Sequence, residues 1–175
     1  TSAHGGVLAI AGDDHVCASS TLPHQSEYDF AAAQMPVLNP AGVQEFLDYG
    51  LYAWALSRYS GLWCGMVCIA ETLDSAAIVS VDPHRVKIVE PTDYALPDGG
   101  LNIRWPDPPL VQEARLHEQK HDAAIAFARA NGLDRVVMDG PKRRVGIVTT
   151  GKAYLDVRQV FDDLGIDDEA AAAMG

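Results

Sequence analysis

The chain has 175 residues, of which 48% are hydrophobic and 21% are charged, a composition typical of one globular domain or of parts of two. Its formal net charge of −11 excludes the basic footprint that non-specific nucleic-acid binding requires. No apolar run reaches the length of a bilayer and no segment resembles a secretory signal, so we expect a cytoplasmic protein with neither a membrane nor a nucleic acid as partner.

Three apolar runs in the first half of the chain predict buried strands. They cover residues 6–11, 35–38 and 62–70. Unbroken apolar runs are typical of parallel strands that are covered on both faces. Residues 75–81 and 85–89 are further candidates for short extended segments.

Two helices are predicted between these strands, the first over residues 24–34. Asn39 and Pro40 suit the N-cap and the first position of the second helix, and Gly61 suits its end. Trp54 lies on the apolar face of this helix, so we expect it to pack in the core.

The second half begins with a proline-rich connector over residues 91–109, in which we expect Trp105 to pack against another surface. A long helix is predicted from about residue 110 to residue 131. Residues 144–150 predict another buried strand, and a helix over 154–164 and a frayed acidic tail follow it. A strand, a glycine and a helix in succession indicate the start of a new α/β unit.

The three cysteines, Cys17, Cys64 and Cys68, are an odd number and include no C-x-x-C pair. Neither a disulfide framework nor an iron–sulfur or zinc site is expected within this chain. We expect three small buried hydrophobic side chains instead.

Polar side chains cluster directly after the first predicted strand. Asp13, Asp14 and His15 follow its terminal glycine, at the end of a parallel strand where ligands collect. Hydroxyl, imidazole and amide side chains come next in the loop, at Ser19, Ser20, His24 and Gln25. The segment therefore predicts a strand that delivers polar groups to a site.

A metal-dependent hydrolase is one alternative for this loop, because Asp13, Asp14, His15 and His24 are residue types that bind divalent ions. The spacing contains no helical pair of ligands, and neighbours at a strand end point in different directions. Turn formation and helix capping are therefore favoured over metal binding.

A serine hydrolase is a second alternative, since Ser19 or Ser20 with His24 and Asp13 are the residue types of a catalytic triad. The G-x-S-x-G elbow that exposes the serine of many hydrolases is absent, which disfavours this interpretation.

Two further alternatives concern the rest of the chain. The turn Gly151-Lys152-Ala153 precedes a predicted helix whose amides could hold an anion, but the P-loop signature is absent and a tight turn is favoured. A non-catalytic α/β interaction module is also open, and its mark would be a closed sheet without a cleft.

The order of several motifs resembles the 2-oxoacid:ferredoxin oxidoreductase superfamily, and within it the indolepyruvate ferredoxin oxidoreductases in their large fused bacterial form. The resemblance covers nearly the whole chain. Its motifs here are Gly12-Asp13-Asp14, Ser19-Ser20, Gln25 with Glu27, Pro36-Val37-Leu38-Asn39-Pro40, Gln44-Glu45, and Gly146 to Tyr154.

The resemblance implies an α/β fold with a partial doubly wound, mainly parallel sheet. Residues 1–90 would be the second half of a thiamine-pyrimidine-binding domain, and residues 91–142 the proline-rich connector and long helix. Residues 143–175 would begin a transketolase-C-terminal-like domain. The chain lacks an initiator methionine, so we expect it to be processed or cut from something longer. The resemblance implies the second, a fragment of a longer parent polypeptide.

The resemblance also implies the chemistry of the parent, which is the oxidative decarboxylation of an indolepyruvate-type 2-oxo acid to an acyl-coenzyme A. Thiamine diphosphate with Mg²⁺ and iron–sulfur clusters would be its cofactors, and ferredoxin or a similar protein its electron acceptor, in a homo-oligomer. The family's activating glutamate, its G-D-G…N motif and its cluster cysteines are missing here. We therefore expect this chain alone to bind none of these cofactors and to be inactive.

By the same resemblance, the loop over residues 13–27 would lie beside the cleft for cofactor and substrate. Ser19, Ser20, His24 and Gln25 would face the ligand, and Asp13 and Asp14 would organise the loop. No catalytic residue and no metal ligand is assigned within the chain.

Overall fold

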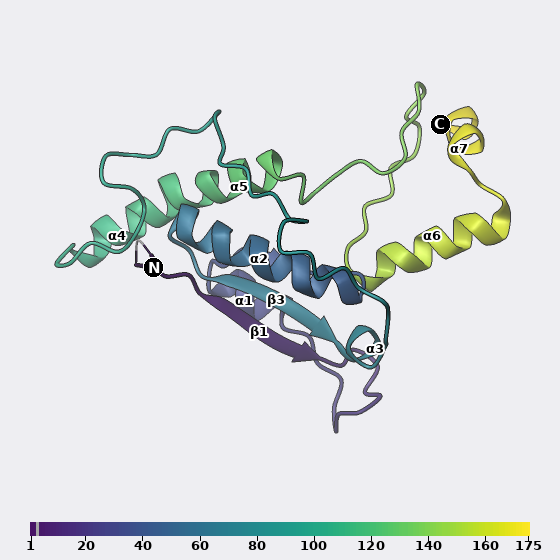
Figure 1. The fold of residues 1–175 in the computed structure, drawn as a ribbon, viewed down its shortest axis with the longest axis horizontal. Coiled ribbons are helices and arrows are strands. Elements are labelled where there is room, and N and C mark those ends of the chain that lie inside the picture. The colour runs from purple at the N-terminus through teal and green to yellow at the C-terminus, as the bar shows by residue number, and fades with distance from the viewer. Residues whose placement is uncertain (3) are drawn as a thin grey trace.

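A three-stranded parallel sheet forms the centre of the computed structural model, which describes residues 1–2 and 4–175 (Figure 1). Its order is β1-β3-β2, with β1 at Leu8–Asp13, β2 at Val37–Leu38 and β3 at Cys64–Ile69. The register aligns Leu8 with Cys64 and Asp13 with Ile69. The α/β class and the three predicted strands are confirmed, with ends shifted by a few residues.

The central strand β3 is buried at all six positions, which explains its unbroken apolar sequence. Helix α1, at Glu27–Ala32, packs its Phe30 ring on Gly65 of this strand. A Cβ atom on Gly65 would lie 2.8 Å from that ring. Glycine is therefore required for the helix to approach the sheet so closely.

The long helix α2, at Val43–Ser60, lies on the sheet, and α5, at His121–Ala130, packs against α2 (Figure 1). The core between them is formed by Leu38, Ala53, Leu56, Leu62, Cys64, Ala124 and Phe127. Gly61 ends α2 in a left-handed conformation with φ of 73°, as predicted. Burial of this shared apolar surface is the main force that holds the two halves of the chain together.

The start of α2 differs from the prediction, because Gly42 and not Asn39 occupies the N-cap position. Glu45 in the first turn accepts a hydrogen bond from the Ala41 N–H at 2.7 Å, so a side chain inside the helix satisfies the chain that enters it. The Asn39 side chain lies instead against Gly151.

Ser57 joins the end of α2 to the start of β1. Its side chain is fully buried, and its Oγ accepts a hydrogen bond from the Val7 N–H at 2.9 Å. The same hydroxyl donates to the Leu62 carbonyl at 2.5 Å. One hydroxyl thereby holds the chain segments that lead into β1 and β3.

After the short helix α3, at Ala70–Leu73, residues 74–108 contain neither helix nor strand. The predicted extended segments at 75–81 and 85–89 are therefore wrong as strands. Their backbones bond to side chains and not to a neighbouring strand, since Gln44 bonds Ser80 and Asn131 bonds Val89.

The predicted long helix is confirmed in extent, but it consists of three parts. Helix α4 at Pro109–Arg115 and helix α5 are joined by a π-helical turn, η1, at Leu116–Lys120.

Trp54 does not pack in the core and Trp105 does not pack against another surface, so both expectations are wrong. Trp54 is 43% exposed and Trp105 is 88% exposed. Helical spacing places Trp54 beside the apolar stripe of α2, but the core is filled by smaller side chains such as Ala53 and Leu56.

The predicted buried strand at residues 144–150 is wrong. Val148 is fully exposed and Ile147 is 57% exposed. The N–H groups of Arg144 and Val145 bond to the Gly175 carbonyl. An apolar run forms a strand only beside another strand, and the described part of the chain offers none at this place.

Two helices complete the chain and project from the rest of the fold in Figure 1. Helix α6 at Lys152–Leu164 ends at Gly165 with φ of 66°, as predicted. Residues expected to fray form helix α7, at Asp168–Met174, because the Asp167 side chain accepts a hydrogen bond from the Ala170 N–H. Of the helices in the described residues, none is both long and apolar enough for a bilayer crossing.

Candidate functional site

The loop after β1 closes on itself through its backbone. It begins at the carboxyl end of β1, an edge strand of the sheet. An antiparallel bridge joins Asp14 to His24, and the His24 N–H donates to the Asp14 carbonyl at 3.3 Å. The polar residues between them are thereby held as one compact loop.

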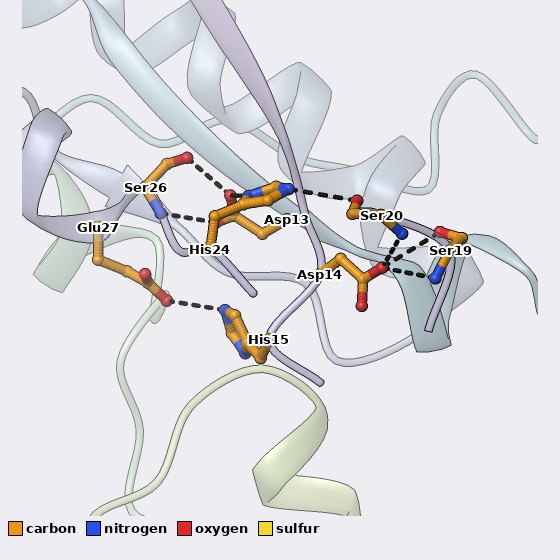
Figure 2. Close-up of polar contacts among 8 residues, drawn as sticks. All are labelled: Asp13, Asp14, His15, Ser19, Ser20, His24, Ser26 and Glu27. Carbon is orange, nitrogen blue, oxygen red and sulfur yellow. Dashed lines mark hydrogen bonds and ion pairs between the residues drawn. The ribbon is translucent and has the colours of Figure 1, made fainter. Parts of the chain in front are cut away.

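The Asp14 carboxylate is the centre of this loop (Figure 2). It is 2% exposed and accepts the backbone N–H groups of Ala18, Ser19 and Ser20, each at 2.7 Å. These amides hold the pKa of Asp14 well below its usual range, because they bond only to the charged form. Asp14 therefore fixes the conformation of residues 18–20.

Asp13 is equally buried, at 2% exposure, but has different partners. Its Oδ2 accepts the Ser26 N–H at 2.9 Å, and its Oδ1 accepts the Ser26 hydroxyl at 2.7 Å. The His24 Nδ1 lies 3.3 Å from the same Oδ1. Asp13 thus links the end of β1 to the residue before α1 and orients an imidazole.

The other nitrogen of that imidazole faces Ser20, with His24 Nε2 and Ser20 Oγ 3.4 Å apart. The structure therefore aligns Asp13, His24 and Ser20 in the order of a catalytic triad (Figure 2). The His24 side chain is 46% exposed, so a ligand can reach it. Sequence reasoning disfavoured this arrangement because no elbow motif is present, but closure of the loop brings the three side chains together.

Ser19 and Gln25, the remaining predicted ligand-facing residues, are both exposed. The Ser19 hydroxyl lies 3.3 Å from the Asp14 carboxylate. Their contact with a ligand remains a prediction.

The four residues of the metal alternative are not brought together as one set, because Asp14 bonds the loop amides and His24 bonds Asp13. A different set lies close together, formed by Asp13, His15 and Glu27. The sequence-based prediction did not include Glu27 among the ligands. His15 Nε2 lies 3.8 Å from its Oε1, and one ligand atom each of Asp13, His15 and Glu27 falls within 4.8 Å of the others. Both Asp13 oxygens already accept hydrogen bonds, which weakens this set as a cation site.

The expectation of three buried cysteines is confirmed for Cys64 and Cys68 and is wrong for Cys17, which is half-buried. Burial raises the pKa of Cys64 to about 12 and also raises the pKa of Cys68. These thiols are protonated at neutral pH and are poor ligands for an iron–sulfur cluster.

The turn at Gly151 also has a structural explanation. Gly151 adopts φ of 57° and lies against the Asn39 side chain. The Lys152 ammonium pairs with Asp156 one turn along α6, at 2.7 Å. This lysine therefore points along its own helix, which favours the tight turn over an anion site.

A family model described as the indolepyruvate oxidoreductase domain matches residues 135–175. The indolepyruvate oxidoreductase subunit IorA of Methanothermobacter thermautotrophicus is 24% identical over 168 residues, which are 95% of this chain. The chain is related to the indolepyruvate oxidoreductases. The resemblance to the indolepyruvate oxidoreductases that the order of the motifs indicated is thereby confirmed.

This indolepyruvate oxidoreductase-related chain spans 26% of the length of the IorA subunit. The match leaves only 5% of this chain unaligned. That part is shorter than the loop after β1, so at least some residues of the loop are aligned with IorA. No solved structure matches the chain.

Proposed function

We propose that this chain is part of a thiamine diphosphate-dependent indolepyruvate ferredoxin oxidoreductase. Its parent would convert an aryl 2-oxo acid and coenzyme A to an acyl-coenzyme A and pass electrons to ferredoxin or a similar protein. The observation that carries the proposal is the relation to IorA along nearly the whole chain. The loop after β1 would form one wall of the cleft, because it lies where ligands of parallel sheets bind.

The donors and acceptors of the loop fit only part of this cofactor set. The exposed Ser19, His24 and Gln25 side chains offer neutral hydrogen-bonding groups to a 2-oxo acid or to the organic part of the cofactor. The amides of residues 18–20 are already bonded to Asp14 and do not fit a diphosphate. We therefore assign the diphosphate, magnesium and cluster sites to other parts of the parent protein.

In this proposal the residues of the chain bind and orient ligands. Asp14 fixes the loop backbone, and Asp13 fixes the imidazole of His24. Ser20 and His24 would then contact the substrate at defined positions. The bound cofactor supplies the electron sink for loss of carbon dioxide from the 2-oxo acid.

An interaction module without catalytic function is less well supported. Its mark would be a closed sheet, whereas in the described residues β1 and β2 each pair with β3 alone. An open edge beside the polar loop suits a domain that continues elsewhere, in the parent or in a partner.

The parent protein tests the proposal through the double variant Ser20→Ala with His24→Ala. We expect its turnover of indolepyruvate, followed by reduction of an electron-acceptor dye in the presence of thiamine diphosphate, to fall by about 10-fold or more. The matched control is Ser80→Ala with His84→Ala, which changes the same residue types at exposed positions of the irregular segment after α3. If turnover and KM are unchanged in the Ser20→Ala, His24→Ala variant, the loop does not line the cleft and the proposal is wrong for this loop.

The isolated chain gives a second test. Titration calorimetry with thiamine diphosphate and Mg²⁺ should show no binding, because the groups that hold the diphosphate are assigned elsewhere. Tight binding would contradict that assignment.

A further inference from the structure

The alignment of Ser20, His24 and Asp13 supports a function that the family relation does not require. We propose that His24 is a proton-transfer group, with Asp13 as the residue that fixes its tautomer and Ser20 as its proton-carrying neighbour. The ligand class is a molecule with an acidic hydroxyl or thiol that binds against Ser20. This inference depends on the geometry of the loop and not on the proposed function.

The tautomer follows from the partners of the imidazole. A carboxylate only accepts hydrogen bonds, so Nδ1 carries the proton that faces Asp13 Oδ1. In the neutral ring, Nε2 then has a free electron pair, and this pair faces the Ser20 hydroxyl. Asp13 itself cannot rotate freely, because Ser26 holds both of its oxygens.

The positions of Ser20 and His24 are fixed by one residue. The carboxylate of Asp14 bonds the Ser20 N–H at 2.7 Å, and the carbonyl of Asp14 bonds the His24 N–H at 3.3 Å. The backbones of Ser20 and His24 are therefore held before any ligand binds, and Asp13 orients the imidazole at 3.3 Å. Such a pre-positioned contact is what proton transfer requires.

The proposed proton transfer involves only the ligand, Ser20 and His24. Ser20 Oγ–H gives its proton to His24 Nε2 and takes one from the hydroxyl or thiol of the ligand. The ligand is left as an anion and His24 as an imidazolium, which the Asp13 carboxylate stabilises.

The geometry favours proton transfer over formation of an acyl-serine. Acyl transfer needs hydrogen-bond donors for the developing oxyanion, and loss of one donor costs about 10²–10³ in rate. The backbone amides nearest Ser20 already bond the Asp14 carboxylate. The set of Asp13, His24 and Ser20, called the relay below, therefore lacks the free backbone amides that a hydrolase would use to bind the oxyanion.

Nitrogen-15 NMR of the histidine rings in the full 175-residue chain tests the tautomer directly. At a pH where the rings are neutral, we expect His24 in the Nδ1–H form and the exposed His84 mainly in the Nε2–H form. In Asp13→Asn, the neutral His24 ring should change from the Nδ1–H tautomer to the Nε2–H tautomer. The Ser26 N–H keeps the new amide oxygen on its own side, so the NH₂ group of the substituted side chain faces Nδ1 and donates to it. Asp29→Asn, an exposed change on α1, is the control and should leave His24 unchanged.

Carbethoxylation with diethyl pyrocarbonate, located by mass spectrometry, tests whether the free electron pair of His24 is accessible. We expect His24 to react in the wild type and to react much more slowly in Asp13→Asn, while His84 reacts equally in both. An Nε2–H tautomer in the wild type would overturn the proposal, even if Asp13→Asn fails to fold. An unreactive His24 in the wild type, or an equal rate in a folded Asp13→Asn, would also overturn it.

Discussion

Removal of the Ser57 hydroxyl tests whether one buried side chain fixes the start of the strand that carries the site. In Ser57→Ala, the buried Leu62 carbonyl loses its side-chain donor, and the Val7 N–H loses its acceptor. A buried polar group without a partner costs about 1–3 kcal/mol. The contact to Val7 is only partly buried, so water offsets some of its loss.

The two losses together should lower the free energy of unfolding by about 2–4 kcal/mol. In a chain of this size, each kcal/mol corresponds to about 2–4 °C in Tm. We therefore expect Tm to fall by roughly 5–15 °C in thermal unfolding followed by circular dichroism. Urea unfolding would give the free energy independently.

Ser80→Ala is the matched control, because it removes an exposed hydroxyl from the irregular segment after α3. Its effect should stay within about 0.5 kcal/mol. If Ser57→Ala destabilises the protein no more than this control does, the role assigned to Ser57 is wrong. Hydrogen exchange should also become faster along β1 in Ser57→Ala, since that strand loses its anchor.

Three other changes probe the core, the loop and the thiols. Phe127→Ala should lower the free energy of unfolding by about 3–5 kcal/mol, measured by urea denaturation, because the ring is 1% exposed between α2 and α5. The bonds from the loop amides to the Asp14 carboxylate should be fully stabilising above the unfolded pKa of about 3.9 and should weaken as the pH falls towards the lower folded pKa. This loss should be seen as lower protection factors of the loop amides, each compared with the intrinsic exchange rate at the same pH. Asp14→Asn should remove that pH dependence; its persistence would contradict the assignment. With Ellman's reagent, the half-buried Cys17 should react first, and the buried Cys64 and Cys68 should react only on unfolding.

Local sequence signals predicted the elements whose cause is local. The apolar run at residues 62–70 contains β3, and Gly61 and Gly165 end their helices in the left-handed conformation. Residues 144–150 show the limit of such signals, because a strand also requires a neighbouring strand in space. Their sequence is apolar, but their hydrogen bonds go to Gly175.

The sequence predicted which residue types form the site, but it did not predict which of their side chains contact one another. The order of polar residues after β1 indicated a functional loop, and the structure confirms that they share one loop. The relay depends on the closure of the loop at Asp14 and His24, which no spacing rule describes. Glu27 was overlooked as a partner of His15 because it lies twelve positions later, at the first residue of α1.

The three amide hydrogen bonds to the Asp14 carboxylate limit which part of a ligand can bind at the loop. Three amides that elsewhere would attract a phosphate are already neutralised by a carboxylate of the chain itself. A second buried carboxylate, Asp13, lies beside it. This end of β1 therefore acts as an electrostatic filter that repels anions and favours cationic or uncharged groups. A ligand with a negatively charged tail would enter with that tail pointing away from the loop.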